Sequence, residues 1–443
     1  MANVCVIGAG SSGIAACQVL QARGIDFDCV EKGSSVGGNW RYRNDNGMSA
    51  AYESLQINTS RRIMEYASFP MPDRYPDYPH HRDIAEYFDA FVDRFGLRER
   101  IRFSTEVTGV EREGEGWRVS FDDGSSESYE AILVANGHHW NPKWPDYAGE
   151  FTGDQIHAHE YRTWKDPVDC EGKNVLVVGG GNSGMDIAVE TSRHAAMTFS
   201  SMRRGYWVIP KYMRGRPVDE LGNSLTTRLP LAIQRRLYLS MLKTAAGLPE
   251  QYGLPKPDHQ ILESHPTVSS DFLPRVGHGR ITIRPDIERL DGNRVRFVDC
   301  SEQAIDVIIW CTGYRLSFPF FDENLLRELR VEGNRIPLYQ RVIAPEHPSL
   351  AFLGFIQPLG AIMPIAERQA EWMADLLDGS GALPPRDEME TEIRRYYAAL
   401  DKRYVSSTRH TFQVDFQPYM RDLARERKAC RKRRGAPTDA VAA

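Results

Sequence analysis

A glycine-rich turn near the start of the chain has the spacing of a dinucleotide-binding motif. The turn reads Gly8-Ala9-Gly10-Ser11-Ser12-Gly13 and follows an apolar run at residues 4–7. Glycines at the first, third and sixth positions let backbone N–H groups approach a pyrophosphate at a helix N-terminus. A second apolar run, residues 27–30, ends in Glu31, at about the 20-residue offset where an acid accepts ribose hydroxyls. We therefore expect residues 8–13 and Glu31 to bind a dinucleotide; a tight turn without a ligand is the alternative.

The same pattern recurs at Gly179-Gly180-Gly181-Asn182-Ser183-Gly184, after an apolar run at residues 175–178. A helical pattern begins at Met185, and the next strand-like run covers residues 197–201. That run is followed by Arg203 and Arg204, where an NAD site would present Asp or Glu. Guanidinium groups at this place suit a 2′-phosphate, so NADP is favoured over NAD. The alternative is that both arginines are ordinary surface charges.

Two dinucleotide sites in one chain indicate electron transfer between two cofactors, and FAD with NADPH is the natural pair. A disulfide reductase would need two neighbouring redox cysteines, whereas the closest pair here is Cys300 and Cys311. The adjacent histidine pairs at 80–81 and 138–139 lack metal-ligand spacing. We therefore expect no metal site.

Composition places the chain among globular proteins that bind small molecules. Its 443 residues are about three times the ~150-residue mode of a domain, so two or three packed units are expected. With 41% apolar residues the chain can bury a core, and its net charge of −5 opposes a general nucleic-acid binder. Seven cysteines without a CxxC pair indicate reduced thiols, and no apolar run reaches the ~18 residues of a membrane span. A cytoplasmic location is the default expectation.

Patterns in the second half of the chain predict two helices and a basic tail. Apolar residues keep helical spacing between residues 365 and 377. A second helix is predicted over residues 229–246, where Ile233, Leu237 and Met241 recur every four residues and are expected to form a buried face. Residues 421–434 are rich in Lys and Arg and are expected to be a solvated helix end or a loose tail rather than a nucleic-acid site.

One segment between the two turns carries a family signature. Residues 151–161 fit the pattern F-x-G-x-x-x-H-x-x-x-(Y/F) at Phe151, Gly153, His157 and Tyr161. Through this motif the chain resembles the flavin-containing monooxygenases, which are class B flavoprotein monooxygenases. The related Baeyer–Villiger monooxygenases usually carry Trp at the last position, so Tyr161 favours heteroatom oxygenation. Taken alone, His157 is better explained as a structural residue than as an acid–base group.

Further segments extend the resemblance over most of the chain. They are Glu31-Lys32, Gly37-Gly38-Asn39-Trp40, Asn58-Thr59-Ser60, the segment from Phe69-Pro70 to His80, Cys311-Thr312-Gly313-Tyr314 and Gln357-Pro358-Leu359-Gly360. The resemblance implies that Glu31 holds the FAD ribose and that its neighbour Lys32 also belongs to the cofactor-binding residues. It also implies that a second set of residues lies near the flavin or its phosphates: Gly38, Asn39, Trp40, Thr59 and Gln357. Asn58 would stand at the reactive centre, although without its neighbours it could equally belong to a polar turn.

The expected fold is α/β, with two Rossmann-like, doubly wound domains, and the NADP-binding domain is inserted into the FAD-binding domain. Turn residues set the expected boundaries. Residues 1–150 and 286–443 are assigned to the FAD-binding domain, which includes the C-terminal helices and the basic tail. Residues 151–285 are assigned to the NADP-binding domain.

The family's chemistry implies that NADPH reduces FAD and that O2 then forms a C4a-(hydro)peroxyflavin. This species would oxygenate soft nucleophiles, giving N-oxides from amines and sulfoxides from sulfides. Baeyer–Villiger oxygenation of ketones and a poorly coupled NADPH oxidase are alternatives on the same scaffold, and a non-catalytic, NADP-responsive regulator is an alternative of another class. A small-molecule substrate and O2 are the expected partners, and a homodimer is the commonest state for such an enzyme. Because the chain lacks the hydrophobic C-terminal anchor of the animal enzymes, a soluble, bacterial-type member is expected.

Overall fold

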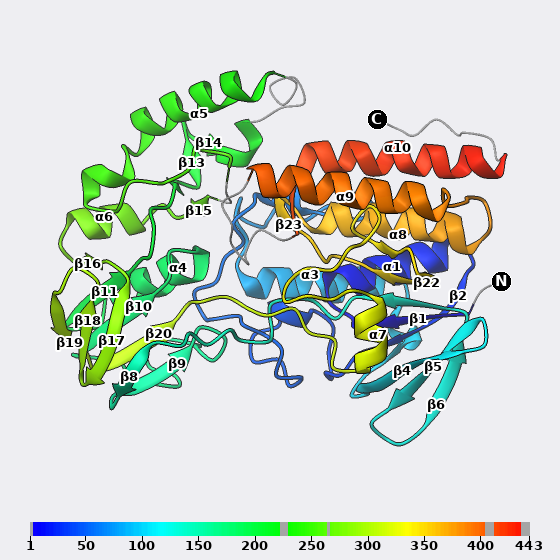
Figure 1. Ribbon diagram of the computed structural model, residues 1–443, viewed down its shortest axis with the longest axis horizontal. Helices are drawn as coiled ribbons and strands as arrows, with labels where there is room; N and C mark the ends of the chain where they lie inside the picture. The colour runs from blue at the N-terminus through cyan, green and yellow to red at the C-terminus, as the bar shows by residue number, and fades with distance from the viewer. Residues whose placement is uncertain (1–2, 222–228, 264–265, 404–411, 436–443) are drawn as a thin grey trace. The chain divides into compact units, whose positions relative to one another are not determined.

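The computed structural model describes residues 3–221, 229–263, 266–403 and 412–435 (Figure 1). The chain divides into two compact units, each considered by itself below. The first unit comprises Met1–Ser49, Arg61–Asn141 and Arg315–Ala443. The second comprises Ala50–Ser60 and Pro142–Tyr314, so it is inserted into the sequence of the first at two places.

The first unit is built on a six-stranded sheet in the order β21-β22-β7-β1-β2-β3, in which only the β21–β22 pair is antiparallel. Four consecutive residues of β1, 4–7, are buried, as expected for a parallel strand covered on both faces. Both strands predicted around the first glycine turn, β1 and β2, are confirmed. The strands are β1 (Asn3–Ile7), β2 (Asp26–Val30), β3 (Ile101–Arg102), β7 (Ala131–Val134), β21 (Ile343–Ala344) and β22 (His347–Phe352).

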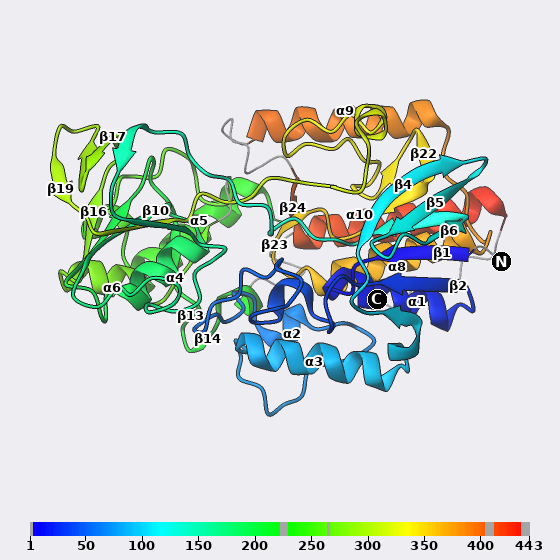
Figure 2. The ribbon, with the colours of Figure 1, turned by 90° about the horizontal axis from the view of Figure 1, so that it is seen from below.

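Helices α1 and α8 pack against each other, and α1 contacts β1, β2 and β7 (Figure 2). The helix predicted over residues 365–377 is α8. The helices of this unit are α1 (Ser11–Ala22), α2 (Arg61–Met64), α3 (His81–Arg94), α7 (Glu323–Glu328), α8 (Met363–Leu377), α9 (Arg386–Arg403) and α10 (Phe416–Arg434). An antiparallel sheet and a strand pair complete it: β4 (Val107–Glu113), β5 (Gly116–Phe121), β6 (Ser126–Tyr129), β23 (Gln357–Leu359) and β24 (Gln413–Asp415).

The basic C-terminal segment is helix α10, and only part of its charge faces solvent. Lys428 and Lys432 are exposed, as predicted. Arg427 and Arg431, however, pair with the buried carboxylate of Asp375 on α8, at 2.7 and 3.0 Å. Burial alone would raise the pKa of Asp375, but the hydrogen bonds from these arginines outweigh it and lower the pKa. The prediction of a solvated end or loose tail was therefore wrong for this face, because a buried acid on the neighbouring helix binds it.

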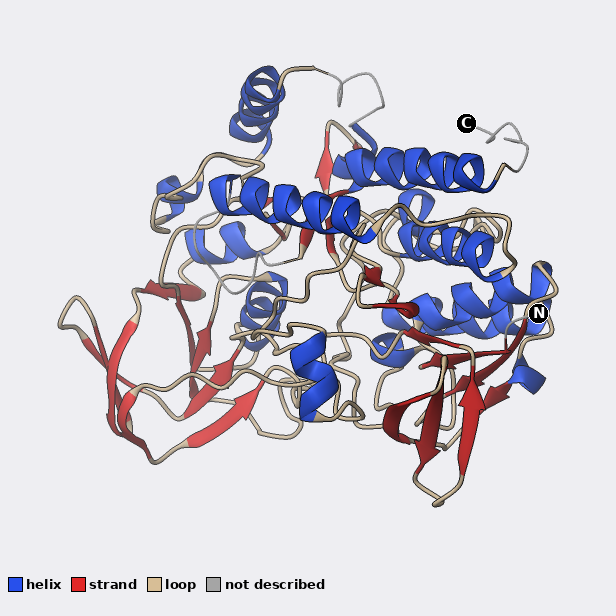
Figure 3. Ribbon diagram, turned by 45° about the vertical axis from the view of Figure 1, so that its right-hand side comes forward, coloured by secondary structure: helices blue, strands red, loops and turns tan. Residues whose placement is uncertain are grey.

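The second unit contains a five-stranded, fully parallel sheet in the order β16-β11-β10-β20-β9 (Figure 3). Because β20 lies between β10 and β9, the unit extends past the domain boundary predicted at residue 285, up to Tyr314. These strands are β9 (Asp154–His157), β10 (Asn174–Val178), β11 (Met197–Ser201), β16 (Ile281–Arg284) and β20 (Val307–Trp310). A second sheet contains β8 (Ala148–Phe151), β17 (Ile287–Gly292), β18 (Arg294–Phe297) and β19 (Glu302–Ala304).

The smaller elements of this unit include one helix that differs from its prediction. They are α4 (Asn182–Thr191), α5 (Leu231–Ala245), α6 (Phe272–Gly277), β12 (Val208–Ile209), β13 (Tyr212–Met213), β14 (Arg216–Pro217) and β15 (Thr267–Val268). Helix α5 lies where it was predicted, but the expected buried face was wrong. Ile233 and Leu237 are 45% and 50% exposed, because within the described residues α5 buries mainly Leu242. In the described ranges, neither α5 nor any other helix has the length and apolar character needed to cross a membrane.

Candidate functional site

The first glycine turn joins β1 to α1, and two of its glycines are required by the protein itself. Gly8 has φ +102°, and a Cβ there would lie 2.8 Å from the carbonyl oxygen of Ala135. A Cβ on Gly13 would lie 1.8 Å from the carbonyl oxygen of Gly8. Gly10 differs, because the nearest atom to its Cβ would be the Cα of Gly38, 3.8 Å away. The space beside Gly10 is therefore open, as a turn that receives a pyrophosphate requires.

The segment Gly38–Trp40 forms a 3-10 turn beside the first glycine turn. The Gly37 N–H donates to the Ala9 carbonyl at 3.0 Å, and a Cβ on Gly38 would lie 3.1 Å from the Cα of Gly10. Two stretches 28 residues apart are thereby brought together, and Gly38 lies beside the turn that is predicted to bind the FAD pyrophosphate. Asn39 and Trp40 follow directly in the same turn.

Glu31 lies at the end of β2, 4% exposed, and its carboxylate is fixed by three donors. Oε2 accepts from the Ala9 N–H at 2.8 Å, while Oε1 accepts from the Gly33 N–H at 2.8 Å and from Asn46 Nδ2 at 3.0 Å. A carboxylate oxygen can accept two hydrogen bonds, so Oε2 keeps capacity for a ribose hydroxyl. Lys32 is placed differently, since its Nζ pairs with Glu106 at 2.9 Å on the surface.

The loop after β7 contributes two polar residues that sequence analysis missed as site residues. Asn136 Oδ1 and both ring nitrogens of His138 are screened from solvent and find no hydrogen-bond partner in the described part of the chain. Burial lowers the pKa of His138 well below its usual range, so the ring is neutral. The signal that could have found them is their place directly after a buried strand.

This loop stands at the switch point of the first sheet. The chain leaves β1 for β2 on one side, whereas β7 adds on the other side, and ligands of parallel α/β sheets bind at such points. The His138 ring lies 5.1 Å from the ring of Phe412, whose carbonyl accepts from the Gln357 N–H at 2.9 Å. The structure therefore brings Gln357 and His138 into one neighbourhood, and the unpartnered atoms there fit a bound polar cofactor.

The second glycine turn repeats the geometry of the first. Gly179 has φ +125° and would place a Cβ 2.4 Å from the carbonyl oxygen of Cys311. A Cβ on Gly184 would lie 2.1 Å from the carbonyl oxygen of Gly179. Gly181 caps α4, which begins at Asn182-Ser183, and Asn182 Oδ1 accepts from the Val268 N–H at 2.9 Å. The turn is thus hydrogen-bonded to β15 and lies against Cys311, the residue that follows β20.

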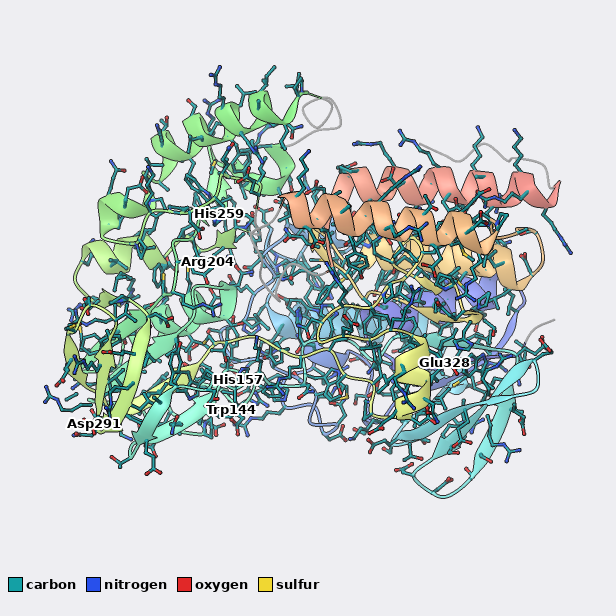
Figure 4. The ribbon with its side chains drawn as sticks, in the orientation of Figure 1. Trp144, His157, Arg204, His259, Asp291 and Glu328 are labelled. Carbon is teal, nitrogen blue, oxygen red and sulfur yellow. The ribbon has the colours of Figure 1, made fainter. Side chains whose placement is uncertain are left out.

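The two arginines after β11 have different surroundings. Arg203 is exposed at the carboxyl end of the strand, where it can reach a phosphate. Arg204 lies over the ring of Tyr206, with 5.7 Å between Cζ and the ring centroid. Figure 4 shows Arg204 in the part of the unit that also carries His259.

Asn58 and Thr59 lie in Ala50–Ser60, which belongs to the second unit, so the structure groups them with the second glycine turn. Asn58 Oδ1 is buried and has no hydrogen-bond partner in the described ranges. Two neighbours are anchored: Gln56 Oε1 accepts from Lys211 Nζ at 3.1 Å, and the Ser60 N–H donates to Asp219 Oδ2 at 2.7 Å. An uncharged amide with a free acceptor is therefore held between two fixed points.

The signature segment supports the second unit's sheet. A Cβ on Gly153 would lie 2.5 Å from the carbonyl oxygen of Asp306, so glycine allows β9 to approach β20. His157 ends β9 opposite Trp310, and its Nδ1 accepts from the His159 N–H at 3.1 Å, which places the ring proton on Nε2. Burial and His159 lower the pKa of His157 to about 4, and Trp144 packs beside it (Figure 4). This neutral, packed ring agrees with the structural role predicted for His157.

Comparison with known proteins identifies the family. A family model described as flavin-binding monooxygenase-like matches residues 1–431. The chain belongs to this family. It is therefore an FAD-dependent NADPH monooxygenase, as predicted from the segment that begins at Phe151.

Two rat relatives extend along almost the whole chain. Flavin-containing monooxygenase 5 of Rattus norvegicus is 35% identical over 445 residues, which cover 95% of this chain and 82% of the relative. Dimethylaniline monooxygenase (N-oxide-forming) 2 of the same species is 33% identical over 446 residues, covering 96% and 82%.

Solved structures share the fold. The S-allyl-L-cysteine S-oxygenase of Allium sativum is 24% identical, with a TM-score of 0.71 over 99% of this chain and 90% of that one. A steroid monooxygenase bound to NADP is 19% identical, with a TM-score of 0.73 over 97% and 98%. The fold class of two Rossmann-like domains, one inserted into the other, is thereby confirmed.

Proposed function

We propose that this flavoprotein monooxygenase oxygenates small, soft nucleophiles that carry nitrogen or sulfur, using NADPH and O2. The observation that supports it most is the pair of glycine turns, since each unit has a turn of dinucleotide type in which the first and sixth glycines leave no room for a side chain. Relatives that act on nitrogen and sulfur compounds, a dimethylaniline monooxygenase and an S-oxygenase, favour this substrate class.

The first unit is assigned to FAD. The open space beside Gly10 at the start of α1 would hold the pyrophosphate, and Glu31 Oε2 would accept a ribose hydroxyl. The loop at Asn136 and His138 supplies uncharged polar atoms at the same edge of the sheet. FAD, when bound, supplies the hydride acceptor and the activation of O2.

The second unit is assigned to NADPH. The turn at residues 179–184 holds the pyrophosphate, and Arg203, with Arg204, pairs with the 2′-phosphate. Because the sheet of this unit continues to β20, the assignment covers residues 142–314.

Asn58 is assigned to the reactive centre. Among the residues that the structure describes, its buried Oδ1 has no partner, and a buried acceptor is costly to leave unpaired, by about 1–3 kcal/mol. A ligand N–H or O–H would satisfy it. An amide does not titrate near neutral pH, so Asn58 orients its partner without releasing a proton.

The test is a product assay on the purified, yellow protein with NADPH and O2. N,N-dimethylaniline and methyl phenyl sulfide should give an N-oxide and a sulfoxide, with NADPH consumed in about equal amount. Asn58→Ala should retain FAD and lose all but a small, measurable fraction of product formation. Conversion of cyclohexanone to its lactone in place of these products would indicate Baeyer–Villiger chemistry, and hydrogen peroxide without any product would indicate an oxidase. A cytoplasmic location and a homodimer stay predictions.

A further inference from the structure

The segment that carries Asn58 is tied to helix α4 by two side-chain hydrogen bonds. Tyr52 Oη donates to Asp186 Oδ2 at 2.7 Å, and Ser54 Oγ donates to Glu190 Oε2. The Glu53 N–H also donates to the Arg162 carbonyl at 2.8 Å. The segment is therefore held from Tyr52 onwards, ahead of the two anchors that flank Asn58.

Both acceptors lie on the face of α4 that starts in the second glycine turn. Residues four apart share one face of a helix, so Asn182, Asp186 and Glu190 follow one another along α4. Asn182 belongs to the turn assigned to NADPH. A rigid helix face thus connects the nucleotide turn to the attachment of the Asn58 segment.

In the Tyr52–Asp186 pair, a neutral hydroxyl donates to a buried carboxylate. Tyr52 is 3% exposed and packs edge-on against Tyr161, with ring centroids 6.2 Å apart. Burial raises the pKa of Asp186 to about 6, so its carboxylate is ionised at neutral pH at a cost that an amide acceptor would avoid. The titratable groups that face Asp186 are Tyr52, Glu190, Lys211, Asp271 and Cys311. Costly buried charges cluster at functional sites, where a charge-assisted hydrogen bond fixes geometry.

We propose that Tyr52 and Asp186 are positioning residues for the oxygenation reaction: they hold Ala50–Ser60 against α4 and so set the position of Asn58 relative to the nucleotide turn. The inference rests on the proposed function, in which Asn58 stands at the reactive centre. According to this inference, the position of Asn58 depends on helix α4, which begins in the glycine turn assigned to NADPH.

A double-mutant cycle tests this proposal. Tyr52→Phe removes only the hydroxyl and should lower kcat for sulfide oxygenation about ten-fold, because small displacements of a reacting group are costly. FAD content and the KM for NADPH should stay within about two-fold of the wild type. If Tyr52 acts through Asn58, the variant that combines Tyr52→Phe with Asn58→Ala should be no slower than Asn58→Ala alone.

Tyr129→Phe is the matched control. Tyr129 is also 3% exposed and donates to a carboxylate, Glu127 Oε2, at 2.7 Å, but it lies in the first unit. This control should leave kcat and the product formed per NADPH unchanged. Equal behaviour of Tyr52→Phe and Tyr129→Phe, or losses from Tyr52→Phe and Asn58→Ala that simply multiply, would overturn the proposal.

Asp186→Asn provides a second variant and keeps an acceptor for Tyr52. Because a neutral acceptor gives up the charge-assisted hydrogen bond, it should lower kcat for sulfide oxygenation as Tyr52→Phe does, while its melting temperature at pH 7.5 equals or exceeds that of the wild type. A variant that is less stable but has the wild-type kcat would show a structural role instead. If Tyr52→Phe fails to fold, Asp186→Asn takes its place in the cycle.

Amide hydrogen exchange supplies a readout independent of turnover. NADP⁺ should slow exchange in peptides covering Ala50–Ser60 by about five-fold or more in the wild type, and much less in Tyr52→Phe. Equal protection in both proteins would contradict the proposal. A wild type that forms no oxygenated product would refute the proposed function, while the exchange result would still decide whether Tyr52 holds the segment.

Discussion

The two glycine turns share one backbone geometry and differ in the charged residue at the end of the next strand. In each turn the first glycine has a positive φ, and the sixth cannot carry a Cβ because the carbonyl oxygen of the first lies 1.8 or 2.1 Å away. After β2 the first unit presents Glu31, which is buried and hydrogen-bonded to the turn itself. After β11 the second unit presents Arg203, which is exposed. In the proposed assignment, each turn holds a pyrophosphate, and the residue at the end of the next strand favours either free ribose hydroxyls or a 2′-phosphate.

The largest expected effect comes from replacing the sixth glycine of each turn, and it should differ between the two turns. Gly13→Ala places a methyl group against the Gly8 carbonyl, so the purified variant should contain no FAD. Gly184→Ala makes the same clash in the second unit and should keep FAD while losing its reduction by NADPH. Flavin absorbance before and after NADPH addition measures both. Gly109→Ala, where a Cβ would make only an ordinary 3.5 Å contact with the Ser120 side chain, is the control and should retain FAD and reduction. Loss of FAD in both turn variants would contradict the assignment of one cofactor to each unit.

The next effect concerns the strand ends. Arg203→Glu should raise the KM for NADPH about 100-fold and leave the KM for NADH unchanged or lower, because the 2′-phosphate loses a charged partner and meets a like charge. Steady-state kinetics with both nucleotides measure it. Arg280→Glu is the control, since Arg280 is also exposed but precedes β16, at the amino end of the same sheet. An unchanged preference for NADPH in Arg203→Glu would remove this residue from the nucleotide site.

The buried His157 of the second unit predicts that the free energy of unfolding falls at acidic pH. Folding lowers the pKa of His157 from 6.5 to about 4, so the unfolded chain binds the proton more readily between these values. Stability from this residue is therefore complete above about pH 6.5 and is lost as the pH falls towards 4. From pH 7 to pH 5 the wild type should lose about 2 kcal/mol of unfolding free energy relative to His157→Gln. Denaturant unfolding at the two pH values measures the difference, and parallel losses in both proteins would disprove it.

The smallest expected effect concerns the loop of the first unit. His138→Phe removes ring nitrogens that lack partners in the described structure, so the FAD-free protein should gain about 1 kcal/mol. The same change should weaken FAD binding about ten-fold, because the cofactor loses a hydrogen-bonding group. Flavin fluorescence titration measures the affinity, and denaturant unfolding of the FAD-free protein measures the stability. Unchanged FAD affinity would place His138 outside the cofactor site.

Local patterns predicted the elements around the site well. Both glycine turns and the strands β1, β2, β10 and β11 lie where residue types and spacing placed them. They could be predicted because the backbone geometry of a turn glycine and the apolar run of a strand buried on both faces depend on residues only a few positions away. Helix α5 shows the limit of this logic, since its periodicity was right and its buried face was wrong. Periodicity specifies an apolar face but cannot specify whether anything packs on it.

The partners of polar side chains were the least predictable contacts of the molecule. Lys32 was expected at the cofactor site because it belongs to the family motif, but its Nζ pairs with Glu106 on the surface. Arg427 and Arg431 were predicted to be solvated, but both donate hydrogen bonds to Asp375, about 50 residues earlier in the chain. Asn136 and His138 were not predicted as site residues, because a polar residue after a strand can be assigned to a site only when the neighbouring strand is known.

The sequence by itself determined the two turns, their strands and the family, because backbone sterics and short-range spacing encode them. The tertiary structure alone decided that residues 50–60 pack with the second unit, that β20 is interior to its sheet, and that Tyr52 meets Asp186. These contacts join residues more than 100 positions apart. Nothing in the spacing of either residue specifies such a partner, because a hydrogen bond depends on where two surfaces meet after the core has packed.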